Sequence, residues 1–175
     1  SLYEWMDEGF TSWIESECMA VLPSFNPDGG NESDIAPGGL HHWAYSRYKR
    51  IVESGKEEPL ITHADHYTTN RAYGVAAYSK GEVLVEQLGA IIGEKMRNEG
   101  MKEYFKVWSF KHPGPTDFKR VMERTSDIEL DWYFDYFVNT THTIDYAISK
   151  VATNKKKSTI ILEKIGIMPM PQDVK

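Results

Sequence analysis

The chain has 175 residues, of which 13% are aromatic, enough for about one domain with a substantial core. Its net charge of −6, without a clustered basic face, argues against a nucleic-acid partner, because phosphates are neutralised by gathered Lys and Arg. No apolar run approaches the roughly 20 residues that span a bilayer, so no membrane-spanning segment is predicted. The single cysteine, Cys18, cannot form an internal disulfide, and we expect it to be a small buried side chain.

The first segment has a helical period, and apolar residues recur at three- and four-residue steps. These residues, which we expect on one buried face, are Met6, Phe10, Trp13, Ile14 and Cys18. Glu8 lies off that face and beside Gly9, so its carboxylate can point away from the core. Residues 23–39 are rich in Pro, Gly, Asn and Asp, which predicts an exposed loop.

Further helices are predicted downstream. One covers residues 40–52 and stops at Gly55, a residue suited to a left-handed C-terminal position. Another begins near Tyr78, and its two-sided apolar pattern through residue 92 predicts the central, deeply buried helix. A short helix is expected to be capped by Thr116 or Asp117, and a last helix to span residues 128–138. In all, we expect about five helices.

Beyond Thr143 the apolar period changes from 3.6 to 2, which is typical of strands. A β-hairpin is therefore predicted from about residue 144 to 165, with a lysine-rich turn at 155–157. The chain as a whole is expected to be mainly α-helical, with this hairpin at its end.

Two segments resemble parts of a zinc peptidase. Residues 5–11, W-M-D-E-G-F-T, and 73–81, Y-G-V-A-A-Y-S-K-G, are similar to two motifs of the aminopeptidase N-like gluzincins. In that family an (N/D)-E-G-F helix supplies the third zinc ligand, and a Y-x-K-G segment supplies a transition-state tyrosine. The resemblance implies that Glu8 is a metal ligand and Tyr78 a catalytic residue, and it makes Tyr73 a candidate for lining the substrate pocket.

The resemblance extends over nearly the whole chain. Residues 128–135 resemble the helix that closes the family's catalytic domain, and residues 59–65 resemble its connector to the catalytic tyrosine. It implies an orthogonal helical bundle in residues 1–141, the C-terminal lobe of a thermolysin-like peptidase domain. Residues 142–175, with their Met-Pro ending, would begin a following β-domain.

The family's H-E-x-x-H segment, which carries two histidine ligands and the general base, lies about 18 residues before the third ligand. Only seven residues precede Glu8, and no H-E-x-x-H occurs elsewhere in the chain. We therefore expect a fragment whose two histidine ligands lie outside this chain, in the N-terminal half of the catalytic domain. The intact parent would use zinc and hydrolyse peptides, whereas the isolated chain would bind no catalytic zinc and be inactive.

These residue types suit that chemistry. A glutamate oxygen is a common zinc ligand, and a tyrosine with a pKa near 10 stays protonated and can donate to a developing oxyanion. Other histidines, at 41, 42, 63 and 66, lack further ligands at zinc-site spacing, so we expect loop or packing roles for them.

A second hypothesis stays open: the chain is a catalytically dead helical interaction module derived from the same fold. An H-E-x-x-H upstream of Glu8 favours the peptidase, and a native start close to Ser1 favours the module. The sequence leaves open the substrate preference, the oligomeric state and the cellular compartment.

Overall fold

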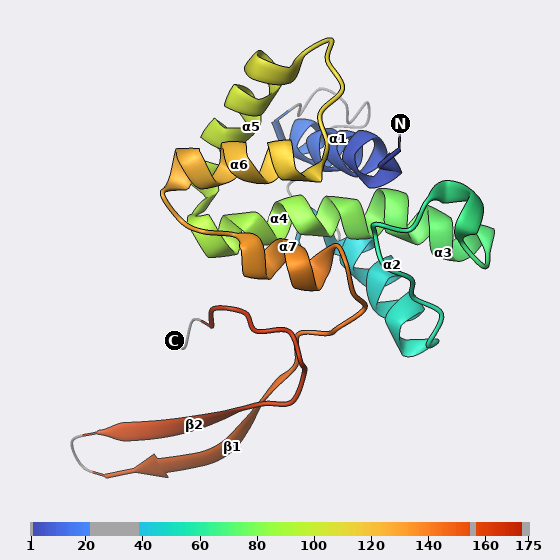
Figure 1. Ribbon diagram of the computed structural model, residues 1–175. Coiled ribbons are helices and arrows are strands. Elements are labelled where there is room, and N and C mark those ends of the chain that lie inside the picture. Colours follow the sequence, from blue (N-terminus) through green and yellow to red (C-terminus); the bar gives the residue numbers. More distant parts are fainter. Residues whose placement is uncertain (1, 22–38, 155–156, 173–175) are drawn as a thin grey trace, which may run out of the picture.

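The computed structural model describes residues 2–21, 39–154 and 157–172. They form a helical body followed by a two-stranded hairpin, as Figure 1 shows. The expected loop at 23–38 and the first two lysines of the expected turn lie outside the described residues. Within the described part of the chain, no helix is long and apolar enough to cross a membrane.

The helical body contains more helices than the five expected, because Glu94–Trp108, in a segment left unassigned by the sequence patterns, and Asn70–Gly74 form helices of their own. The elements in chain order are η1 (Trp5–Gly9), α1 (Phe10–Val21), α2 (His42–Glu53), η4 (Ala64–His66), α3 (Asn70–Gly74), η5 (Val75–Lys80), α4 (Gly81–Ile92), α5 (Glu94–Trp108), α6 (Pro115–Ser126) and α7 (Asp131–Phe137). The η1 and η5 segments are π-helical, and η4 is a 3₁₀ turn.

Helix α4 is the central helix, as predicted. It runs through the middle of the helical body, with α1 and α6 on one side and α7 on the other (Figure 1). Its residues Val83, Leu84 and Leu88 are fully buried. Helix α7 is fixed to it by the Tyr133 hydroxyl, which donates to the carbonyl oxygen of Leu84 at 2.9 Å. The helix ends at Gly93, whose φ of 86° starts the turn into α5.

The buried face of α1 is narrower than the sequence pattern predicted. Phe10 and Trp13 are buried as expected, but Ile14 is 47% exposed and Cys18 is exposed, so the expectation of a buried cysteine is wrong. The inward face continues from Trp13 to Glu17, whose carboxylate meets His41. Each helical residue is turned by about 100° from the one before, so positions 14 and 18 point outward.

The predicted cap of α6 is also wrong. Gly114 is the N-cap residue, Pro115 is the first helical residue, and the Asp117 carboxylate accepts a bond from the Gly114 amide at 2.9 Å. Proline is suited to the first helical position because that position needs no N–H donor. Helix α7, Asp131–Phe137, is shorter than predicted, and Gly55 has the expected positive φ of 66° after α2.

The hairpin is present where the change of period predicted it. Strands β1 (Tyr146–Thr153) and β2 (Ser158–Lys164) pair antiparallel, with a register irregularity between Ile148 and Lys150. The hairpin extends away from the helical body (Figure 1). After it, Met168 returns to the helical core and is fully buried. The mainly helical fold with a C-terminal hairpin is therefore confirmed.

Candidate functional site

Glu8 and Tyr78 lie on two short π-helical segments that pack against each other, η1 and η5. A π-turn holds an extra residue within a helix, and such turns are frequent at functional sites. Each leads directly into a longer helix, η1 into α1 and η5 into α4. Tyr78 is 42% exposed and Glu8 is partly buried, so both side chains reach the surface at this contact.

Two glycines explain how closely the segments approach. A Cβ atom on Gly9 would lie 2.6 Å from the Gly81 Cα, and a Cβ on Gly81 would lie 2.9 Å from both the Gly9 Cα and the Trp5 carbonyl oxygen. All of these neighbours are backbone atoms, which cannot rotate away. The glycines of D-E-G-F and Y-S-K-G thus allow the two backbones to touch and bring Glu8 and Tyr78 together.

The side chains of Glu8 and Tyr78 influence each other electrostatically. A hydrogen bond between the Tyr78 hydroxyl and the Glu8 carboxylate is the largest cause that raises the pKa of Tyr78 above its ordinary 10.0. The phenol therefore stays protonated through the neutral range and remains a hydrogen-bond donor. Tyr73, on α3, lies near enough to add to the same shift. Its ring makes an edge contact with Tyr67 at 5.6 Å.

Lys80, two residues after Tyr78, is buried rather than available at the surface. Its Nζ lies 2.6 Å from the Glu57 carboxylate and 3.3 Å from the Thr140 carbonyl oxygen. Burial lowers the pKa of Lys80, and the carboxylate of Glu57 partly opposes that effect. The lysine ties η5 to the connector after α2 and to the segment that follows α7, which agrees with a role in shaping the start of α4.

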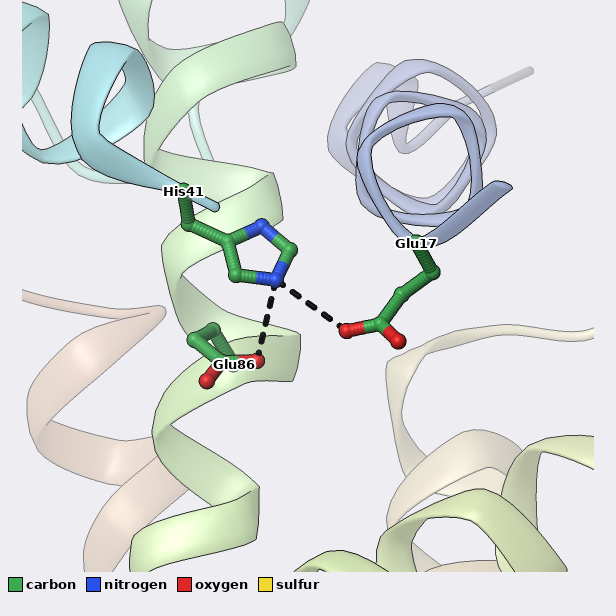
Figure 2. Close-up of side chains that lie close together, drawn as sticks. All are labelled: Glu17, His41 and Glu86. Atoms are coloured by element: carbon green, nitrogen blue, oxygen red, sulfur yellow. Dashed lines mark hydrogen bonds and ion pairs between the residues drawn. The ribbon is translucent and has the colours of Figure 1, made fainter. Parts of the chain in front are cut away.

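A second polar cluster lies elsewhere along the same pair of helices, and sequence reasoning missed it. His41, which precedes α2, is 7% exposed and points between Glu17 of α1 and Glu86 of α4, as Figure 2 shows. Its ring is stacked on Trp13 with 6.3 Å between centroids. Its carboxylate partners are 24 or more positions away, so no local spacing reveals the cluster. By contrast, His63 and His66 sit at an exposed turn, where His63 caps η4.

The described residues do not form a complete zinc site around Glu8. Among them, close groups of three or more possible metal ligands occur only at Glu17, His41 and Glu86, which does not include Glu8. Glu8 suits a single ligand position, since its carboxylate reaches the surface beside a phenol donor. A catalytic zinc takes three protein ligands, so two would have to come from outside these residues.

Comparison with known proteins identifies the family to which this chain belongs. Residues 3–137 match the Peptidase family M1 domain. The chain belongs to peptidase family M1. The M1 match takes in both η1 and η5 and ends at Phe137, the last residue of α7. The described helices from η1 to α7 thus lie within the part of the chain that matches the M1 domain.

One curated relative is Aminopeptidase N of Streptomyces lividans, which is 24% identical over 136 residues. The aligned part covers 78% of this chain but only 15% of that relative, so the chain spans a small part of its length. No solved structure was found to match the chain.

Proposed function

We propose that this chain is part of a zinc-dependent aminopeptidase, in which Glu8 is the third zinc ligand and Tyr78 the transition-state donor. The observation that carries the proposal is the close packing of the segment that bears Glu8 against the segment that bears Tyr78, within the M1-matching region. The two groups come from segments about seventy residues apart. A core-packing role for either side chain does not require them to meet at the surface.

The two residues would have distinct roles. Glu8 would supply an anionic oxygen to the metal, whose chemistry in such sites is to polarise the scissile carbonyl and acidify water. Tyr78 would donate its phenolic proton in a hydrogen bond to the oxygen on which negative charge develops. A tyrosine suits this role, because the donor must remain protonated at working pH and the ordinary pKa of a phenol is near 10. Tyr73 would line the substrate pocket beside Tyr78.

The remaining ligands would lie outside this chain. An H-E-x-x-H segment upstream of Glu8 would add two histidine ligands and a general base, and residues 142–175 would begin a β-domain after the catalytic domain. We therefore propose that the intact protein hydrolyses N-terminal residues from peptides, and that the isolated chain is inactive. One carboxylate cannot replace three ligands and a base.

The full-length protein tests this proposal. We expect an H-E-x-x-H about 18 residues before Glu8, zinc in the purified protein, and chelator-sensitive hydrolysis of aminoacyl substrates. Tyr78→Phe should lower kcat by roughly 10²–10³-fold with the zinc content unchanged, as for loss of one oxyanion donor. Glu8→Gln should instead lower the zinc content itself.

Two matched controls separate these effects from general damage. Tyr136→Phe removes a hydroxyl far along the chain, and Glu15→Gln removes an exposed carboxylate from α1; neither should change kcat or zinc content. Full activity in Tyr78→Phe would contradict the role of Tyr78. A full-length protein without H-E-x-x-H and without hydrolysis would favour the interaction module. Chelator-sensitive hydrolysis by the isolated chain would contradict its inactivity.

A further inference from the structure

The geometry around His41 determines how many protons its ring carries. Its Nδ1 lies 2.8 Å from the Glu82 carboxylate. Its Nε2 lies 3.2 Å from Glu17 and 3.3 Å from Glu86. An ionised carboxylate only accepts hydrogen bonds, so each ring nitrogen that faces one must donate. A neutral imidazole has one N–H and would place a lone pair against an anionic oxygen on one side.

The surroundings of His41 carry an excess of negative charge. The carboxylates that face it from the packed helices are Glu17 on α1 and Glu82 and Glu86 on α4. Arg97 on α5 and the Tyr45 hydroxyl on α2 interact in turn with these carboxylates. Arg97 is 3% exposed and supplies one positive charge by donating to Glu86. Three carboxylates against one guanidinium leave room for a second cation, and the ring of His41 lies at their centre.

A metal ion is a weaker candidate for that second cation. The ligand atoms of Glu17, His41 and Glu86 lie within 4.8 Å of one another, a spacing that an ion could bridge. The Glu86 oxygen nearest His41, however, already accepts from Arg97 and from the Trp13 indole, the latter at 3.1 Å. An ion bound to that oxygen would face the guanidinium at close range, and the two positive charges would repel.

We propose that His41 is held as an imidazolium ion that joins α1 to α4, and that loss of its proton loosens α1 from the helical body. The imidazolium bridges Glu17 on one helix to Glu82 and Glu86 on the other. Ser16, on α1, reinforces the link by donating to the Glu82 carboxylate at 2.9 Å. Deprotonation would turn one of these attractive contacts into a repulsive one.

The direction of the pH dependence follows from the same contacts. Burial by itself would lower the pKa of His41, but the hydrogen bonds and charges of Glu82, Glu86 and Glu17 outweigh it and raise the pKa above 6.5. A group with a raised pKa in the folded state contributes its full stabilisation below the unfolded value. That stabilisation is lost as the pH rises through the higher folded value, so the link would weaken on the alkaline side of pH 6.5.

Nitrogen-15 NMR of the histidine side chains tests the proposal on this chain. At pH 6, both ring nitrogens of His41 should show imidazolium shifts, and the group should titrate above 6.5. Amide protection factors in α1 should fall as the pH rises through that titration, by up to tenfold for each unit that the folded pKa exceeds the unfolded one. Protection in α6 should not follow this titration. A neutral tautomer at pH 6, or α1 protection independent of the titration, would overturn the proposal.

Variants and added metal complete the test. Glu82→Gln keeps the size of the side chain but removes the charge facing Nδ1, so it should lower the His41 pKa and the pH at which α1 loosens. His112→Gln, at an exposed position, should change neither. Zn²⁺ is also added to the chain at pH 7. If one equivalent shifts the His41 signals and raises amide protection in α1, a metal ion takes the place of the second proton on the ring, and the proposal is overturned.

Discussion

Two contacts join the segments η1–α1 and η5–α4, and they are built differently. In the first, Gly9 and Gly81 bring two backbones into direct contact beside Glu8 and Tyr78. In the second, His41 and three glutamates bridge the helices through side-chain charges. Backbone contact has one geometry and does not depend on protonation, whereas a charged bridge depends on pH. The contact that carries the candidate catalytic residues is therefore the more rigid of the two.

The largest expected effect comes from the buried pair that anchors the rigid contact. Lys80 and Glu57 are 2% and 6% exposed in their side chains, and Lys80→Met would leave the Glu57 carboxylate buried without its partner. Breaking such a pair costs about 3–5 kcal/mol in the free energy of unfolding, measured by urea denaturation. Lys95→Met, which breaks an exposed pair with Glu99, should cost under about 0.5 kcal/mol.

A double variant sharpens that test. Lys80→Met with Glu57→Leu removes both charges, and most of the lost stability should return, because a buried pair replaced by apolar side chains is often neutral. A Lys80→Met variant as stable as the parent chain would show that the pair does not anchor η5.

The glycine contact can be broken next. Gly81→Ala would place its Cβ 2.9 Å from the Gly9 Cα and the Trp5 carbonyl oxygen, so the backbones must separate. We expect a loss of about 1–3 kcal/mol, the usual range for overpacking. Gly74→Ala is the matched control, since nothing lies within 4 Å of its added Cβ. It should be neutral or stabilising by about 0.5–1 kcal/mol, because alanine is the better helix former. Equal effects in the two variants would count against a tight glycine contact.

The smallest effect is expected at the charged bridge. Ser16→Ala removes one hydroxyl donor to the Glu82 carboxylate and should cost about 1 kcal/mol. Ser12, one turn earlier on the same helix, donates only to the backbone carbonyl of Glu8, so Ser12→Ala should change stability by under about 0.5 kcal/mol. Thermal unfolding at pH 6 compares the two variants, and no difference between them would mean that the serine does not support the bridge.

The local motifs identified Glu8 and Tyr78 as candidate site residues, whereas no local pattern revealed the bridge at His41. Glu8 and Tyr78 were recognisable because each stands in a short segment with fixed neighbours, including the glycines. The role of His41 depends on partners at least 24 positions away, which no periodic pattern connects. The burial of Lys80 depends likewise on Glu57 and Thr140, brought together only by the fold.

Errors in the predicted elements also have physical causes. The change of period beyond Thr143 identified the hairpin, because a two-residue repeat is a local property. Helix α5 was not recognised, since its sequence is mostly polar and only part of one face is buried. Ile14 and Cys18 were placed in the core because both are apolar and continue the helical spacing of Phe10 and Trp13. In the structure the inward face continues from Trp13 to Glu17 instead, and Glu17 is held there by its contact with His41.

The pKa of Tyr78 tests the central claim most directly. The measurement is an NMR titration of the chain labelled with ¹³C-tyrosine, in which the variant Tyr78→Phe identifies the signal of Tyr78. We predict that Tyr78 has a pKa above 10.0, that this pKa falls in Glu8→Gln, and that it is unchanged in Glu15→Gln. Circular dichroism through the titration would check that the helices persist. A Tyr78 that titrates at its ordinary value and does not respond to Glu8→Gln would contradict the placement of the two groups in one site.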